Sequence, residues 1–306
     1  MHTSAQFLVI GEALIDIVAR HAETPVEHVG GSPANVAVGL ARLDHQVRFA
    51  TCLGEDARGD RIRQHLAHRG VEVVDGSGDY PTSTAQAILD ETGAASYVFD
   101  LYWDPGQIDL PPQVHHVHTG SIAAVLEPGG SQILDALDRG RSQATVSYDP
   151  NFRPSIMGDL DAARSRIEAV IARADVVKAS SDDVAIMYPE LTLEQVMQRW
   201  TALGPALAVV TRAEDGVSYR LAGMDEMVTR AAPPTVVVDT VGAGDSFMAG
   251  LVSGLAAAGL LGGPDARVRL ASAHPEQVEP AIERGARCGA ITVSRAGAYA
   301  PSLDEL

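Results

Sequence analysis

The sequence predicts an α/β fold, in which a doubly wound, mostly parallel sheet carries helices on both faces and a small β-sheet is added. Three observations support this prediction. Short apolar segments typical of buried strands alternate with helical patterns along most of the chain. Two extended segments without a helix between them interrupt that alternation. The 306 residues, 46% hydrophobic and 21% charged, suffice for a large core.

The first units of the alternation lie near the N-terminus. Phe7–Ile10 predicts a buried strand. A helix should follow, with Ser32 as its N-cap and Pro33 at its first position. Val47–Thr51 predicts the next strand, and apolar spacing around Ile62–Leu66 predicts the next helix.

A hairpin interrupts this pattern. Thr84–Asp90 and Ala94–Asp100 are extended runs joined by the turn sequence Glu91-Thr92-Gly93. We therefore expect a flap inserted into the α/β core.

After the hairpin the alternation resumes. Strands are predicted at His115–Thr119, Thr145–Tyr148, Val176–Lys178 and Leu207–Thr211, with helices around Ile133–Leu137, Arg164–Ile171 and Leu193–Leu203.

The C-terminal third adds a second hairpin, one more strand, two long helices and a loop rich in Pro and Gly. The hairpin is predicted at Gly216–Arg220 and Met227–Arg230, the strand at Thr235–Val238, the helices at Gly244–Ala258 and Val278–Val293, and the loop at Gly262–Pro280.

Composition narrows the class of protein. Forty acidic residues against 23 Lys and Arg give a formal net charge of −17, which disfavours nucleic-acid and membrane-surface partners. Two distant cysteines, Cys52 and Cys288, make neither a disulfide framework nor a zinc site. Because the sequence shows no membrane-length apolar stretch and no signal-peptide pattern, we expect a cytoplasmic enzyme.

The most informative segment is Asp239–Phe247, DTVGAGDSF, between an apolar run and a predicted helix. Its glycines let backbone amides converge, and a helix N-terminus adds free donors and a positive dipole end. These features predict an anion-binding site. Because the carboxylate of Asp245 would repel a resting phosphate there, we interpret it as the base that deprotonates an attacking hydroxyl.

The segment has other interpretations. A purely helix-capping role for Asp245 is the structural alternative. The chain contains no GxxxxGK[ST] pattern, and the third glycine of a dinucleotide fingerprint is missing. A P-loop enzyme and an NAD-dependent oxidoreductase are therefore disfavoured.

Two motifs carry a resemblance to a known family. Asp239–Asp245 resembles the DTxGAGD signature of the PfkB (ribokinase-like) carbohydrate kinases, and Gly30–Ala37 resembles their GGxxAN(x)A signature. The resemblance implies a single kinase domain over residues 1–306 with a small β-sheet lid. The lid segments would be about Ala13–Val29 and Thr84–Trp103.

The resemblance also implies roles for individual residues. Asp245 corresponds to the catalytic base, and the amides of Gly242, Ala243 and Gly244 correspond to an anion hole for the transferred phosphoryl group. The residues that correspond to sugar contacts are Asp16, Gly31, Asn35 and Arg153.

The nucleotide side departs from the family pattern. Thr211–Gly216 resembles the TxGxxG turn beside the ATP phosphates, with Ala213 in place of the first glycine. Asp175–Asp183 resembles the DxxKxNxxE segment, with Ser180 in place of Asn and Asp183 in place of Glu. The ATP contacts implied by the resemblance are Ser180, Thr211, Gly216 and Gly244.

Metal sites follow from the same resemblance. Asp183 and Asp149 would hold Mg²⁺, mainly through water, and the ion would neutralise the ATP phosphates. A K⁺ site built mainly from backbone carbonyls is also implied. Its residues would be Asp239, Val241, Thr292, Arg295, Gly297 and Ser302.

Three observations favour fructose as the acceptor, phosphorylated at a primary hydroxyl. Asp149–Arg153 resembles the DPNxR stretch of the fructokinase-like branch. Tyr102 and Trp103 at the hairpin end suit an apolar sugar face. Gly30–Asn35 and the hairpin lack the basic cluster that a sugar phosphate would require. Arg153 would pair well with a carboxylate, so 2-keto-3-deoxygluconate is a rival, and ribokinase and nucleoside kinase activities stay open.

A non-catalytic sugar-binding protein is the alternative from another class, and the intact Gly242–Asp245 segment argues against it. The expected partners are a sugar and ATP, with a homodimer through the lid implied by the resemblance. His115, His116 and His118 form a cluster. Strand alternation places His116 and His118 on one face, but no third ligand is evident, so a metal site is not expected there.

Overall fold

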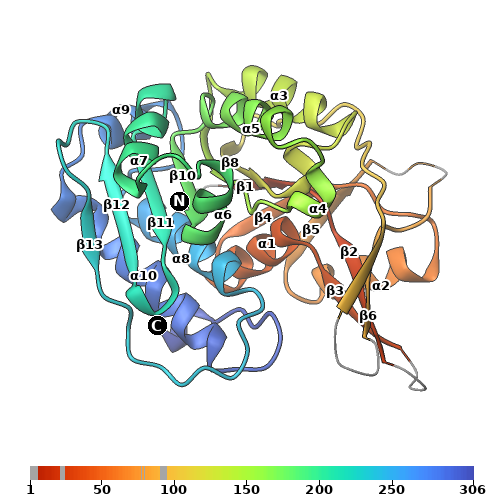
Figure 1. Cartoon of the computed structure of the whole chain (residues 1–306). Coiled ribbons are helices and arrows are strands. Elements are labelled where there is room, and N and C mark those ends of the chain that lie inside the picture. The colour runs from red at the N-terminus through yellow and green to blue at the C-terminus, as the bar shows by residue number, and fades with distance from the viewer. Residues whose placement is uncertain (1–5, 21–24, 77, 79, 90–94) are drawn as a thin grey trace.

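Two sheets organise the molecule (Figure 1). The computed structural model describes residues 6–20, 25–76, 78, 80–89 and 95–306. The large sheet has nine strands in the order β13-β12-β11-β10-β9-β8-β1-β4-β5. All neighbours from β5 to β11 pair in parallel, and β12 and β13 add an antiparallel edge. The predicted doubly wound α/β fold is confirmed.

Strands and helices of the large sheet alternate along the chain. The strands are β1 (Gln6–Ile10), β4 (Gln46–Thr51), β5 (Val71–Asp75), β8 (Val114–Gly120), β9 (Thr145–Asp149), β10 (Val176–Ser180), β11 (Leu207–Thr211), β12 (Val217–Leu221) and β13 (Val228–Arg230). The helices are α1 (Ser32–Arg42), α2 (Ala57–Ala67), α3 (Gly129–Gly140), α4 (Pro154–Met157), α5 (Leu160–Ile171), α6 (Ser181–Met187), α7 (Leu193–Leu203), α8 (Ala243–Ala257), α9 (Pro264–Ala271) and α10 (Pro275–Val293), with 3-10 turns η1 (Ile122–Ala124), η2 (Ala213–Asp215) and η3 (Leu303–Glu305).

Side-chain alternation along β1 explains why helices cover both faces. Phe7 and Val9 point into one core, together with residues of α1, α2, α8 and α10. Leu8 and Ile10 point into the other core, together with residues of α3, α5, α6 and α7. All four side chains are buried, as expected for a central strand of a parallel sheet.

The small sheet has four strands in the order β3-β2-β6-β7 and projects from one end of the body (Figure 1). Its strands are β2 (Leu14–Arg20), β3 (Val26–Gly30), β6 (Thr84–Leu89) and β7 (Ala95–Asp100). Strands β6 and β7 pair antiparallel, which confirms the predicted hairpin. The turn predicted at Glu91–Gly93 lies outside the described residues.

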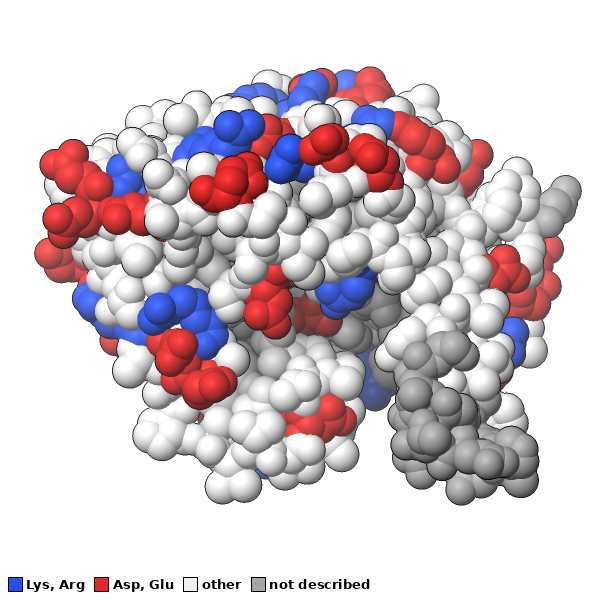
Figure 2. All heavy atoms as spheres, in the orientation of Figure 1, with Lys and Arg blue, Asp and Glu red and all other residues white. Residues whose placement is uncertain are grey.

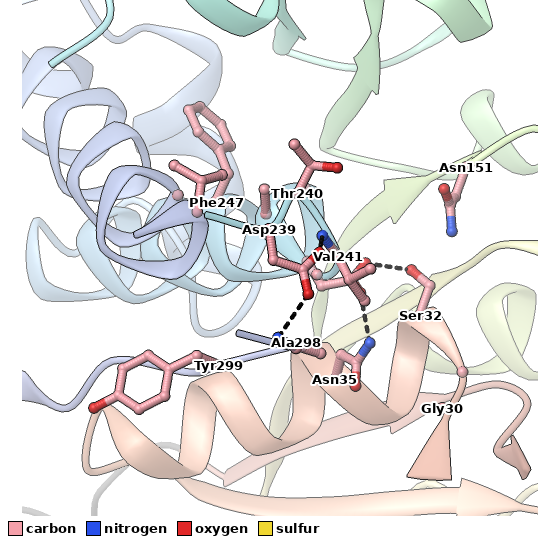
Figure 3. A pocket seen from close by; sticks show the side chains of 18 of the residues that line it. Gly30, Ser32, Asn35, Asn151, Asp239, Thr240, Val241, Phe247, Ala298 and Tyr299 are labelled. Atoms are coloured by element: carbon pink, nitrogen blue, oxygen red, sulfur yellow. Dashed lines mark hydrogen bonds between the residues drawn. The ribbon is translucent and has the colours of Figure 1, made fainter. Parts of the chain in front are cut away.

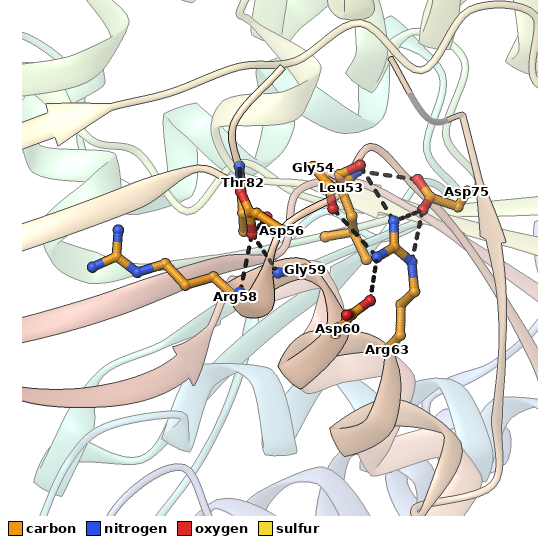
Figure 4. Close-up of polar contacts among 9 residues, drawn as sticks. All are labelled: Leu53, Gly54, Asp56, Arg58, Gly59, Asp60, Arg63, Asp75 and Thr82. Carbon is orange, nitrogen blue, oxygen red and sulfur yellow. Dashed lines mark hydrogen bonds and ion pairs between the residues drawn. The ribbon is translucent and has the colours of Figure 1, made fainter. Parts of the chain in front are cut away.

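Polar contacts tie α2 to the segments beside it (Figure 4). Asp56 caps α2, and its carboxylate also accepts hydrogen bonds from the amide and hydroxyl of Thr82, at 2.8 and 2.7 Å. On the same helix, Arg63 pairs with Asp75 at the end of β5, with 2.5 Å between Nη2 and Oδ2. The chain is therefore anchored to the body just before it enters β6.

Two predicted segments differ in secondary structure from the prediction. Thr235–Val238 forms no strand, and its valines are 63–78% exposed because no neighbouring strand pairs with this segment. The predicted loop Gly262–Pro280 contains α9 and the start of α10. Pro264 and Pro275 occupy the first turns of these helices, where a missing N–H costs no hydrogen bond.

None of the described helices has both the length and the apolar character that a membrane span requires.

Candidate active site

A cleft of about 2210 Å³ lies at the carboxyl ends of the parallel strands and beside the small sheet. Figure 2 shows a hollow in the surface between the body of the molecule and the small sheet, and charged side chains lie inside this hollow. The Gly30–Asn35 segment and the Asp239–Asp245 segment both line the cleft, from opposite halves of the sequence. The structure therefore brings the two motifs together.

The glycine motif forms the start of α8. Gly242 is the N-cap residue and adopts a φ of 75°, which favours glycine. A Cβ at this position would also lie 2.8 Å from the Cβ of Ala298, closer than real Cβ contacts. Because α8 begins at Ala243, the amides of its first turn have no carbonyl partner inside the helix. Ala243 N donates to Thr240 O at 3.3 Å, so the loop partly uses one of the three predicted anion-hole amides.

Asp245 of α8 is in direct contact with α1 through Ser32 and Asn35, two side chains that Figure 3 shows in the pocket. Its Oδ1 accepts a hydrogen bond from Ser32 Oγ at 2.6 Å, and its Oδ2 accepts one from Asn35 Nδ2 at 2.8 Å. No side chain caps α8, so the purely capping interpretation of Asp245 is wrong. Removal from water raises the pKa of Asp245, and the donors Ser32 and Asn35 oppose that rise.

The start of α1 differs from the prediction. Gly31, with a φ of 108°, is the N-cap residue, and Ser32 is the first residue of the helix. A Cβ at Gly31 would lie 2.5 Å from the carbonyl oxygen of Glu12. Ser32 therefore does not cap α1, because its hydroxyl is committed to Asp245. The sequence Ser-Pro is compatible with Ser32 either as the N-cap or as the first residue of the helix, so the prediction of Ser32 as the N-cap was wrong.

A buried lysine lies beside the motif. Lys178 Nζ donates to Asp149 Oδ2 at 2.8 Å and to the carbonyl of Gly244 at 3.2 Å. The side chains of Lys178 and Asp149 are 4% and 3% exposed, so the charges compensate each other away from water. Lys178 is a site residue without a predicted role, although a lysine inside the apolar strand β10 is a usable signal.

Another carboxylate that lines the cleft is Asp183 of α6. Asp183 Oδ2 accepts from Ser180 N at 3.3 Å, and Asp183 N donates to Ser180 Oγ at 3.1 Å, which forms a capping box at α6. Burial raises the pKa of Asp183, and the charge of Asp149 raises it further. Ser180 and Asp183, the two residues that depart from the family pattern in this segment, therefore bond each other, and both line the cleft.

The predicted nucleotide residues lie at one end of the cleft. Thr211, Gly216 and Ser180 line it, together with Ala213. Ala213 adopts a φ of 46°, the left-handed conformation that the family's glycine would take without strain. The exposed side chain of Val237, which lies in the wrongly predicted strand, also lines this end.

Four predicted sugar contacts lie at the other end of the cleft. Asp16, Gly31, Asn35 and Arg153 line it, and burial raises the pKa of Asp16. Tyr102 does not line the cleft, because its ring stacks on Tyr80 with 3.4 Å between centroids. Tyr97 and Phe99 of β7 do line it, and so do Phe247 and Tyr299.

Known proteins resemble the chain over its whole length. A family model for pfkB family carbohydrate kinases matches residues 4–305. The chain belongs to this family. The activity of this carbohydrate kinase, phosphoryl transfer to a sugar, agrees with the prediction from the two motifs.

Several relatives of the kinase are fructokinases. The fructokinase of Klebsiella pneumoniae is 34% identical over 314 residues, 97% of each chain. A fructokinase from Xylella fastidiosa, solved with bound ATP, has a TM-score of 0.84 at 27% identity and covers 99% of this chain and 97% of its own. An aminoimidazole riboside kinase from Salmonella enterica, complexed with aminoimidazole riboside and an ATP analog, has a TM-score of 0.78 at 26% identity and covers 98% of each chain.

The segment predicted to hold a monovalent cation joins two loops of the kinase. Asp239 Oδ1 accepts from Val241 N at 3.0 Å, and its Oδ2 accepts from Gly297 N at 2.8 Å (Figure 3). These amides lower the pKa of Asp239. The other predicted side chains have protein partners: Thr292 bonds the carbonyl of Tyr299, Ser302 bonds Glu305, and Arg295 lies over the Tyr299 ring.

Two of the three clustered histidines of the kinase have side-chain partners within the protein. His116 and His118 lie on one face of β8, as predicted, and both bond to Ser147 Oγ at 2.9 Å. His116 also bonds to Thr145 Oγ1. Burial lowers the pKa of both rings. Nowhere in the described part of the chain do three or more His, Cys, Asp or Glu residues form a group that could hold a metal.

Proposed function

We propose that Asp245 is the general base of an ATP-dependent fructokinase. The observation that carries the proposal is the pair of hydrogen bonds from Ser32 and Asn35 to its carboxylate. These bonds aim the carboxylate into a cleft lined by both family motifs. Burial raises the pKa of Asp245, and the hydrogen bonds from Ser32 and Asn35 oppose that rise because they stabilise the ionised carboxylate, the form that accepts a proton.

In this mechanism the primary hydroxyl of the sugar lies against Asp245. The carboxylate takes the hydroxyl proton as the oxygen attacks the γ-phosphorus of ATP, and the bond to ADP breaks. The amides at Gly242–Gly244 stabilise the charge on the transferred group. Lys178 fixes the carbonyl of Gly244 and so holds this first turn in place.

The nucleotide fits the end of the cleft with Thr211, Gly216 and Ser180. Val237 supplies an apolar wall on which the adenine can lie. Asp149 and Asp183 would hold Mg²⁺, which suits a site of two carboxylates completed by phosphates and water. The ion would supply charge neutralisation for the ATP phosphates.

The sugar fits the end of the cleft beside the small sheet, which we propose to be a lid. Asp16 and Asn35 can accept from and donate to vicinal hydroxyls. Phe99 and Tyr97 supply the apolar face that Tyr102 was expected to supply. The fructokinases among the relatives favour fructose. The exposed guanidinium of Arg153 supports the acid sugar 2-keto-3-deoxygluconate as the second candidate.

The lid also supports a homodimer. Val26, Val18, Ala87 and Tyr97 form one row across a face of the small sheet. Val26 and Tyr97 are 54% and 62% exposed. Val18, Ala87 and Tyr97 also line the cleft, so a second copy of this chain that covers the row would close this side of the sugar site. Light scattering on the purified protein would report the mass of the assembly.

The function is tested with kcat/KM on a panel of fructose, 2-keto-3-deoxygluconate, ribose and a nucleoside. We expect fructose to be preferred. Asp245→Asn keeps the size of the side chain but removes the base, so turnover should fall by at least about 100-fold with sugar binding retained. A preference for another acceptor would refute the fructose assignment alone, whereas near-normal turnover of the Asn variant would refute the role of Asp245. A chain that binds fructose without consuming ATP would be a sugar-binding protein.

A further inference from the structure

Glu12 is a buried carboxylic acid that the proposed mechanism does not use. It follows β1, and its side chain lines the cleft although the residue is only 5% exposed. The chain leaves β1 toward β4 on one side, while β8 pairs on the other side. This is a topological switch point of the sheet, where open α/β sheets bind their ligands.

The side chain of Glu12 is fixed to the loop after β8. Its Oε2 accepts from the amide of Ala123 at 3.2 Å, and the neighbouring Ser121 side chain lowers the pKa of its carboxyl group. Ser121 adopts a φ of 58°, an uncommon conformation for a residue with a side chain. Its amide donates to the carbonyl of Asp149 at 2.9 Å. Residues held in such conformations cluster at functional sites.

The backbone of Glu12 is fixed to the start of α1. Its carbonyl packs so tightly against Gly31 that a Cβ there would lie 2.5 Å away. A Cβ at the preceding Gly11 would overlap the ring of Pro33. The segment from β1 to β2 and the segment from β3 to α1 are therefore in contact at Glu12. Ser32, which orients Asp245, is the residue between Gly31 and Pro33.

We propose that Glu12 is a positioning residue for phosphoryl transfer. Its side chain fixes the junction of the two sheets to η1. The junction in turn holds Ser32 and Asn35 in the orientation in which they bind the carboxylate of Asp245. This inference rests on the proposed role of Asp245 as the base. It assigns to Glu12 no contact with the sugar or ATP. The hydrogen-bonding acid, rather than its negative charge, performs the task.

The protonated state fits the surroundings. Burial raises the pKa of Glu12 to about 7, and the charge of Asp245 on α8 contributes to the rise, while Ser121 and the amide of Ala123 oppose it. Tyr148 on β9 is the other titratable group that interacts with it. Among the described residues, Glu12 forms no ion pair with a basic side chain. An ionised Glu12 would therefore draw water into the junction.

The test compares Glu12→Gln with Glu12→Ala in the whole chain. Asp245→Asn is measured alongside them. Glu194→Gln, at an exposed position on α7, is the matched control. The Gln variant keeps the shape and the hydrogen bonds of the neutral acid. We expect it to retain turnover within about 3-fold, whereas the Ala variant should lose about 10- to 100-fold in kcat with a nearly unchanged KM for the sugar. The kcat of the unmodified enzyme should fall as pH rises through about 7, and Glu12→Gln should lack this fall.

Stability supplies a second measurement that does not depend on turnover. The pKa of Glu12 is raised from an ordinary value of 4.5 to about 7, so the folded protein binds more protons than the unfolded chain between these values. Its contribution to stability is complete below pH 4.5 and is lost as pH rises through 7. Urea unfolding should show this loss in the unmodified protein and in Glu194→Gln, but not in Glu12→Gln.

Three outcomes would overturn the proposal: a Gln variant as impaired as the Ala variant, a loss confined to KM, or identical pH profiles for Glu12→Gln and the unmodified enzyme. Each of these would leave the proposed function intact as long as Asp245→Asn is inactive. An active Asp245→Asn would instead refute the proposed function itself.

Discussion

The hydroxyl of Ser32 donates to the carboxylate of Asp245 over 2.6 Å, although 213 positions separate the two residues in the sequence. Ser32 belongs to the glycine-rich segment that starts α1, and Asp245 to the glycine motif that starts α8. Helices α1 and α8 pack against the same face of the large sheet. The orientation of the proposed base is therefore set by a helix that follows the small sheet.

Removal of the Ser32 hydroxyl should weaken the base and change its titration. Ser32 lowers the pKa of Asp245, so Ser32→Ala should move the acidic limb of the kcat/KM profile to higher pH. We also expect kcat to fall by about 2- to 10-fold, the value of one hydrogen bond. Ser272→Ala, at an exposed position after α9, is the control. An unshifted acidic limb in Ser32→Ala would contradict this assignment.

Ala213 should be a strained position. Its φ of 46° costs a residue with a Cβ about 1–2 kcal/mol, and glycine avoids this cost. Part of the gain is offset because glycine is more flexible in the unfolded chain. Ala213→Gly should therefore stabilise the protein by roughly 0.5–1 kcal/mol in urea unfolding. Ala222→Gly, at an exposed turn without a positive φ, should destabilise it, and equal effects of the two changes would refute the explanation by strain.

Lys178 and Asp149 should be coupled energetically. Lys178→Met leaves the carboxylate of Asp149 buried without its cation, which should cost about 3–5 kcal/mol in unfolding free energy. The double change Lys178→Met with Asp149→Asn should cost clearly less than Lys178→Met alone. Additive losses in this double-mutant cycle would show that the two charges do not stabilise each other.

A monovalent cation should activate the enzyme. The carboxylate of Asp239 joins the loops that contain Val241 and Gly297, and a cation held by their carbonyls would order the start of α8. Rates in K⁺ should exceed rates in tetramethylammonium at matched ionic strength. Asp239→Asn should reduce this difference, because an amide oxygen attracts a cation less than a carboxylate. Equal rates of the unmodified enzyme in both salts would refute the proposed cation site.

The sequence by itself determined the α/β alternation and the inserted hairpin, and it singled out Asp245 as the base that we propose. Strand and helix periodicities are local, so Phe7–Ile10 and Leu193–Leu203 could be assigned without knowledge of their neighbours. The glycine motif identified Asp245 because a carboxylate among anion-binding amides needs a chemical role. The sequence also marked Ala213 as a departure from the family pattern.

Only the tertiary structure decided which groups surround Asp245. Local propensity favoured a strand at Thr235–Val238, but a strand needs a partner, and the fold offers none there. Ser32 has a capping pattern, yet its hydroxyl bonds a carboxylate from a distant helix. The partners of Lys178 and Glu12 likewise come from segments remote in the sequence. Burial and hydrogen bonding between such segments arise when the sheets assemble, and therefore no local pattern records them.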